Sequence, residues 1–116
     1  MMELVALLGS GKGTWAQVAG VINQGDWDSI TLVGNDFAKK FTTEKDFEFI
    51  EMKTSRLVEL KEELLTKLRG KFKGTEVALS IASGDGKEHM ALISALLATP
   101  VGIRFTALTK DGIVFM

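Results

Sequence analysis

The sequence predicts an α/β sandwich built on a mostly parallel sheet of about six strands. Apolar runs of strand length alternate along the 116 residues with segments whose apolar residues recur at helical spacing. Such alternation favours parallel strands joined by right-handed helical crossovers, with helices on both faces of the sheet. Hydrophobic residues make up 46% of the chain and charged residues 25%, a composition that argues against disorder and against a coiled coil.

The first half of the chain supplies three strands. LVALL, residues 4–8, is continuously apolar and bounded by glycine, as is typical of a strand covered on both faces. A helix follows and has ended by Gly25; its apolar stripe consists of Trp15, Val18, Ala19 and Ile22. A second strand is expected over 29–35, one or two helical turns beginning at an aspartate cap over 36–41, and an alternating edge strand over 47–52.

The second half begins with a long helix that Thr54 or Ser55 is expected to cap and Gly70 to end. Its apolar stripe consists of Leu57, Leu60, Leu64, Leu65 and Leu68. A buried strand is expected over 76–82, followed by a glycine-rich turn and a very apolar helix that stops before Pro100. The first, second and fourth strands would thus lie inside the sheet.

The last segment predicts a β-hairpin. GIRFTAL and GIVFM are two strands joined by a turn that ends in Asp111-Gly112. With the preceding elements they complete a Rossmann-like three-layer sandwich. Neither a repeat nor a low-complexity linker interrupts the chain, so residues 1–116 are interpreted as a single domain.

Charge and residue usage limit the classes of partner. A formal net charge of −1 gives no general attraction to duplex nucleic acid or to anionic membranes, so any polyanion site has to be local. Without cysteine, and with one histidine, a metal site is not expected, and no cofactor is predicted. The apolar stretches are too short to span a bilayer and Met1-Met2-Glu3 lacks the charged start of a signal peptide, so a cytoplasmic location is expected.

Two glycine-rich loops form the candidate site. They follow the first and fourth strands, which are neighbours in a sheet of order 3-2-1-4-5, so both loops should line one crevice. Backbone N–H groups, helix N-termini, small hydroxyls and one lysine in each loop suit a phosphate or another anion. The alternative is that the glycines serve only the turns. The candidate ligand-binding residues are Gly9, Ser10, Gly11, Lys12, Gly13, Thr14, Ser83, Gly84, Asp85, Gly86 and Lys87.

The first loop, GSGKGT, resembles the phosphate loop of adenylate kinases. A Walker A motif needs a glycine where this chain has Ala6, and Gly13 rather than a hydroxyl residue directly follows Lys12. The chain also lacks a lid domain and an arginine cluster to neutralise a transferred phosphoryl group. A small P-loop-like nucleotide-binding protein therefore stays an alternative to the main hypothesis.

The second loop, SGDGK at 83–87, together with the helix after it, resembles the signature of the CARF family, the CRISPR-associated Rossmann fold. That family has a T-G-G-T-K type turn after its fourth strand. Gly84 and Lys87 match, Ser83 replaces threonine, and Asp85 and Gly86 depart from the pattern. The motif resemblance covers the two loops, whereas the architectural resemblance spans the whole chain.

This resemblance implies a stand-alone domain that binds a cyclic oligoadenylate messenger across a homodimer. Some stand-alone members are ring nucleases, in which a ribose 2′-hydroxyl attacks the neighbouring phosphate without a metal. Lys87 and Ser10 are the candidate catalytic residues, because such a reaction needs stabilisation of the phosphate charge. A binding domain for another phosphorylated or anionic metabolite, and a protein-binding domain with purely structural glycines, are the other hypotheses.

Other residues point to packing or to the surface. The last helix is apolar almost all round, so it should be buried on more than one side. This favours a dimer over a monomer, and the alternative is a core helix that the terminal hairpin covers. His89 is interpreted as a helix-surface residue, and Trp15 as a core residue or as a platform for adenine. Glu48 and Glu51 alternate on the edge strand, where paired carboxylates keep the edge soluble.

Overall fold

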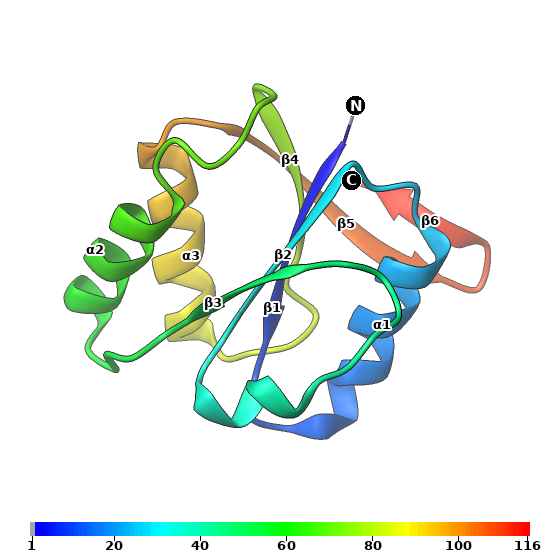
Figure 1. Cartoon of the computed structure of the whole chain (residues 1–116), viewed down its shortest axis with the longest axis horizontal. Coiled ribbons are helices and arrows are strands. Elements are labelled where there is room, and N and C mark those ends of the chain that lie inside the picture. The colour runs from blue at the N-terminus through cyan, green and yellow to red at the C-terminus, as the bar shows by residue number, and fades with distance from the viewer. Residues whose placement is uncertain (1) are drawn as a thin grey trace.

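A six-stranded sheet of order β3-β2-β1-β4-β5-β6 organises the chain (Figure 1). The computed structural model describes residues 2–116, apart from the side chain of Lys12. Strands β1 to β5 run parallel, and β6 pairs antiparallel with β5. The strands are β1 Glu3–Leu8, β2 Ser29–Gly34, β3 Glu48–Glu51, β4 Glu76–Ser80, β5 Gly102–Thr109 and β6 Gly112–Phe115. The helices are α1 Trp15–Gln24, α2 Leu57–Leu68 and α3 Gly86–Ala98, with short 3₁₀ turns η1 Lys12–Thr14 and η2 Asp36–Lys40.

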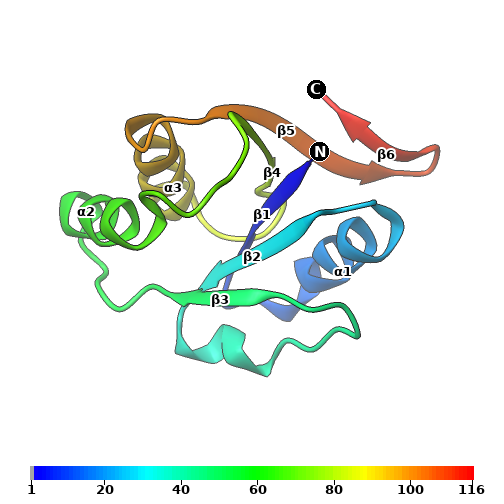
Figure 2. The same cartoon turned by 45° about the horizontal axis from the view of Figure 1, so that its top comes forward.

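Strand β1 lies at the centre and divides the core into two layers. All six of its residues are buried. Leu4, Ala6 and Leu8 pack in the cluster that includes Val18 and Ile22 of α1. Val5 and Leu7 face the opposite way, into the cluster that contains the leucines of α2 and the apolar residues of α3. Figure 2 shows α1 on one side of the sheet and the α2–α3 pair on the other. The α/β class, the mostly parallel sheet and the helices on both faces are therefore confirmed.

The terminal hairpin and the edge position of β3 are also confirmed. Residues 106–109 of β5 pair with 112–115 of β6, and Gly112 adopts a φ of +101°, which favours glycine. Strand β3 pairs only with β2. The expected cap of the turn after β2 is wrong, because Asn35 and not Asp36 accepts the N–H of Ala38, at 3.3 Å.

The predicted cap of α2 is wrong as well. Its N-cap residue is Arg56, and no side chain caps this helix. The N–H and hydroxyl of Thr54 instead donate to Glu63 Oε1 at 3.0 and 2.9 Å, and this carboxylate lies two turns into the helix. The Thr54 side chain thus bonds to a charged acceptor and does not cap the N–H groups in the first turn of α2. The helix ends at Leu68, followed by Gly70 at a φ of +72°.

Helix α3 packs on α2 and on β5, so it is buried on two sides as its composition predicts. Its buried residues are Ala91, Leu92, Ala95 and Leu96. Met90 and Leu97 lie outside these contacts and are 57% and 58% exposed. Helix α3 therefore presents an apolar strip at the surface. In the part of the chain that the structure describes, no helix has the length and apolarity needed to cross a bilayer.

Candidate functional site

The loops after β1 and β4 meet at the carboxyl edge of the sheet, as their positions after neighbouring strands predict. Ser83 is 1% exposed, and its Oγ accepts the backbone N–H of Gly9 at 2.8 Å. The Thr14 hydroxyl donates to the same Oγ at 2.7 Å. The buried Ser83 side chain therefore links the second loop to the first.

Two of the loop glycines serve this close approach. A Cβ on Gly9 would lie 2.6 Å from the backbone nitrogen of Gly84, which no real structure tolerates without a shift. Gly84 has a φ of +98°, and a Cβ there would lie 2.4 Å from a methyl group of Leu7. For this pair, turn geometry and packing explain why glycine is present.

Gly11 and Gly13 have no such explanation. A Cβ on either would meet no heavy atom within 4 Å, and neither has a positive φ. Gly86 is equally unconstrained. The described fold therefore does not require glycine at these three positions, two of which line a cavity.

That cavity, here called the loop pocket, has a volume of about 390 Å³. It is lined by Gly9, Ser10, Gly11, Gly13, Thr14, Gly84, Asp85 and Glu88. Most of the predicted ligand-binding residues thus converge on one space. Three do not line it: Ser83 lies buried below, and Gly86 and Lys87 lie outside. The side chain of Lys12 lies outside the described residues, so its predicted contact is not placed.

The N-terminus of α3 is occupied by a capping box. Asp85 Oδ1 accepts the N–H of Glu88 at 2.8 Å, and Glu88 Oε1 accepts the N–H of Asp85 at 2.9 Å. The helix N-terminus that was predicted to meet an anion is therefore already paired with carboxylates. The loop pocket consequently has carboxylate acceptors in its lining, and the exposed Ser10 supplies a hydroxyl, while the Gly9 N–H and the Thr14 hydroxyl are already donated to Ser83.

Trp15 and His89 each contact a backbone carbonyl oxygen of one loop. Trp15 Nε1 donates to the carbonyl oxygen of Gly9 at 2.9 Å, and its ring packs on Phe37 and Phe41, with centroids 5.6 and 5.9 Å away. This confirms the interpretation of Trp15 as a packing residue. His89 is half-buried, and its Nε2 lies 2.9 Å from the carbonyl oxygen of Ser83. The interpretation of His89 as a plain surface residue is therefore wrong, because it supports the second loop.

A second cavity, here called the Asn35 pocket, adjoins the loop pocket. It has a volume of about 210 Å³ and lies where β2 and β3 end and α2 begins. It is lined by Asn35, Met52, Lys53, Thr54, Ser55, Leu60, Lys87 and Glu88. Glu88 lines both cavities and so separates them. Of these residues only Lys87 was predicted as a site residue, because the others belong to segments far apart in sequence.

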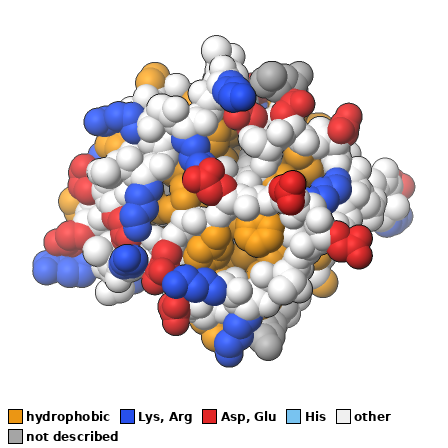
Figure 3. Space-filling view, in the orientation of Figure 1, with side chains coloured by type: hydrophobic (Ala, Val, Ile, Leu, Met, Phe, Trp, Pro, Cys, Tyr) orange, Lys and Arg blue, Asp and Glu red, His pale blue; other side chains and the backbone are white. Residues whose placement is uncertain are grey.

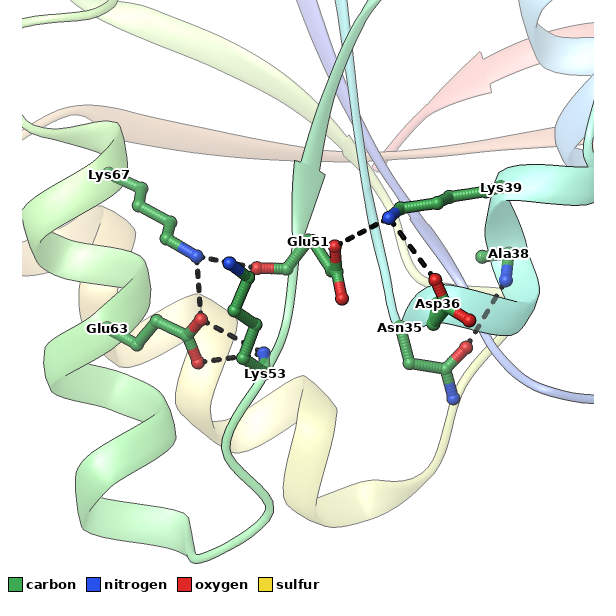
Figure 4. Close-up of polar contacts among 8 residues, drawn as sticks. All are labelled: Asn35, Asp36, Ala38, Lys39, Glu51, Lys53, Glu63 and Lys67. Carbon is green, nitrogen blue, oxygen red and sulfur yellow. Dashed lines mark hydrogen bonds and ion pairs between the residues drawn. The ribbon is translucent and has the colours of Figure 1, made fainter.

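Glu63 fixes one rim of the Asn35 pocket (Figure 4). Its carboxylate accepts the N–H of Lys53 at 2.9 Å and the Lys67 ammonium at 2.7 Å, in addition to the bonds from Thr54. Burial raises the pKa of the Glu63 carboxyl, but the hydrogen bonds from Lys67, Thr54 and Lys53 outweigh this effect and lower the pKa from 4.5 to about 2. The segment at 53–54 is thus anchored to α2 by a carboxylate that is ionised at neutral pH.

The charged groups of the β3 edge are paired. Glu51 binds the ammonium of Lys39 at 2.8 Å, and Glu48 forms an ion pair with Lys71. Figure 3 shows apolar side chains gathered at the centre of this face and ringed by charges of both signs. The two glutamates therefore act as expected of a protected sheet edge.

Neither metal-binding groups nor comparisons with known proteins assign a function to this site. Among the residues that the structure describes, no group of three or more His, Cys, Asp or Glu side chains could hold a metal ion. In comparisons with known proteins, no family model matches the chain, and no curated protein matches it either.

Proposed function

We propose that this chain is a Rossmann-like sensor domain of the CARF type, which binds a cyclic oligoadenylate as a homodimer. The observation that carries the proposal is the presence of glycine at positions 11 and 13. Both residues line the loop pocket, and neither packing nor a positive φ requires glycine there. Glycine leaves the backbone accessible to a ligand, which accounts for its use at a phosphate- or nucleotide-binding loop.

The lining of the loop pocket suits a nucleoside better than a free phosphate. Its charged side chains, among those that the structure describes, are the carboxylates of Asp85 and Glu88. Carboxylates repel a phosphate but accept hydrogen bonds from an adenine amino group or from ribose hydroxyls. The exposed Ser10 hydroxyl is a donor in the rest of the lining, whereas the Thr14 hydroxyl already donates to Ser83 and can only accept from a ligand. A nucleoside presents donors and acceptors to such a lining at once.

The test is retention of labelled cyclic tetra-adenylate and cyclic hexa-adenylate by the purified protein. A Cβ on Gly11 or Gly13 would meet no heavy atom within 4 Å, and both residues line the loop pocket, so we expect Gly11→Val and Gly13→Val to keep the folded state and to abolish retention. Gly86→Val is the matched control, because Gly86 is equally unconstrained but does not line the pocket. No retention of either ring by the wild-type protein would overturn the proposal.

Whether the protein also cleaves the ring can be measured in the same binding experiment. Ser10 lines the loop pocket and Lys87 lines the Asn35 pocket, so the two predicted catalytic residues border different cavities. Binding is accordingly the function that we propose. Chromatography of the retained ligand separates intact rings from linear products, and linear products that disappear in both Ser10→Ala and Lys87→Ala would add ring nuclease activity.

Retention of another phosphorylated metabolite in place of the rings would support the second hypothesis, a binding domain for a different anion. Competition against the labelled rings with AMP, ATP and inorganic phosphate distinguishes the two. A ring-specific site resists all three competitors at equal concentration, whereas a general anion or mononucleotide site does not.

A further inference from the structure

The Asn35 pocket differs from the loop pocket in the kind of groups that it presents. Asn35 Oδ1 accepts the N–H of Ala38, which leaves its NH₂ group as a donor. Figure 4 shows this nitrogen on the side of Asn35 that faces away from Ala38. The exposed Ser55 hydroxyl and Lys87 ammonium have no partner among the described residues. Residues that carry three free donor groups thus line a cavity of about 210 Å³.

The charges of the lining favour an anion more than those of the loop pocket do. Lys53 and Lys87 are positive and Glu88 is the one carboxylate of this lining, whereas the loop pocket is lined by the carboxylates of both Asp85 and Glu88. Figure 4 shows the side chain of Lys53 running back toward Glu51, so Lys87 provides the cation. The first turn of α2, beside Ser55, has no side-chain cap, so its partial positive charge adds to that of Lys87.

The pocket is also held in shape before a ligand arrives. The bonds from Lys53 and Thr54 to Glu63 fix the strand-to-helix connection. Met52 and Leu60, which are 6% and 1% exposed, supply its apolar part. A cavity whose backbone is already fixed loses little conformational entropy when an anion binds.

We propose that the Asn35 pocket is a phosphate subsite that holds the phosphodiester next to the nucleoside in the loop pocket, with Glu88 between the two cavities. The proposal rests on the proposed function, because it names the place of the phosphate in the same ligand. A linked nucleoside and phosphate would span both cavities. Lys87 thereby contacts phosphate from the second cavity and not from the crevice between the loops.

The test uses two probes, cyclic tetra-adenylate and inorganic pyrophosphate, in titrations followed by ¹⁵N–¹H NMR spectra and by calorimetry. Asn35→Asp keeps the oxygen that caps Ala38 and replaces the donor by a negative charge, so the fold is retained. We expect Asn35→Asp and Lys87→Ala each to weaken binding of both probes by roughly tenfold or more. Asn23→Asp on α1 is the matched control, because it makes the same charge change on an exposed residue outside both pockets.

The outcomes separate this proposal from the proposed function. Pyrophosphate that shifts the amide signals of residues 35, 55 and 87 supports the subsite, even if the wild-type protein does not retain the ring. Pyrophosphate that shifts only residues 9–14, or no residue, overturns it. Ring binding that Gly11→Val abolishes and Asn35→Asp leaves unchanged also overturns the subsite, while the proposed function stands.

Discussion

Ser83 Oγ accepts the backbone N–H of Gly9 across 74 residues of sequence, at 2.8 Å and out of contact with solvent. This bond joins the loop after β1 to the loop after β4. Because the Thr14 hydroxyl shares the same oxygen, the entry to α1 is held by the same side chain. The geometry of the loop pocket thus depends on a serine that does not line it.

Ser83→Ala should lower the free energy of unfolding by about 1–3 kcal/mol, because it leaves the buried N–H of Gly9 without an acceptor. Urea denaturation at neutral pH measures the change. Ser10→Ala is the control: Ser10 is exposed, and its replacement should change stability by less than about 0.5 kcal/mol. Equal stabilities for the two variants would show that the Ser83 bond does not hold the loops.

Gly9→Ala should cost about 1–3 kcal/mol or more, because the new methyl group would lie 2.6 Å from a backbone atom that cannot rotate away. Gly11→Ala meets open space at a φ that alanine adopts, so its stability should be equal to that of the wild type or higher by up to about 1 kcal/mol. Thermal unfolding of the two variants provides the comparison. The idea that the glycines have different roles fails if both substitutions are equally harmful.

Glu63 makes the stability of the protein depend on acidity. Its pKa in the folded chain is about 2, below the 4.5 of an unperturbed glutamate. Its contribution of roughly 2–3 kcal/mol is complete above about pH 4.5, and it is lost as the pH falls from there through about 2. The stability difference between the wild-type protein and Glu63→Gln should therefore shrink over this interval in urea titrations. Glu59→Gln, at a side chain that is 52% exposed, should show no such convergence.

Dimerisation, if α3 provides the contact, should respond to charge on its exposed strip. Leu97 is 58% exposed, so Leu97→Glu should leave the free energy of unfolding of the monomer within about 0.5 kcal/mol of the wild type. It should convert a dimer into a monomer in size-exclusion chromatography with light scattering, because a glutamate is costly to bury in an apolar contact. Val58→Glu on α2, at a residue 69% exposed, should leave the dimer intact. A monomeric wild-type protein would contradict this prediction.

The secondary structure followed from local patterns. The run at residues 4–8 is apolar at every position, which predicted a strand covered on both faces, and all residues of β1 are buried. The position of β1 beside β4 followed from the strand order of a doubly wound sheet, and with it the meeting of the two glycine loops. The caps were predicted less well. Thr54 or Ser55 was expected to cap α2, but the Thr54 hydroxyl donates to the Glu63 carboxylate, which comes within reach once the helix has folded back beside β3.

The sequence by itself determined the α/β class, the strand order and the place where the two loops converge, because hydrophobic periodicity is a local property of the chain and strand order follows the general pattern of doubly wound sheets. Only the tertiary structure decided the roles of the polar residues there. It buried Ser83 as the acceptor that links the two loops, paired Asp85 with Glu88, and placed Lys87 in the lining of a separate pocket with Asn35. A hydrogen bond requires its two atoms to lie about 3 Å apart, and for segments distant in the chain that distance is set by the packing of the whole fold.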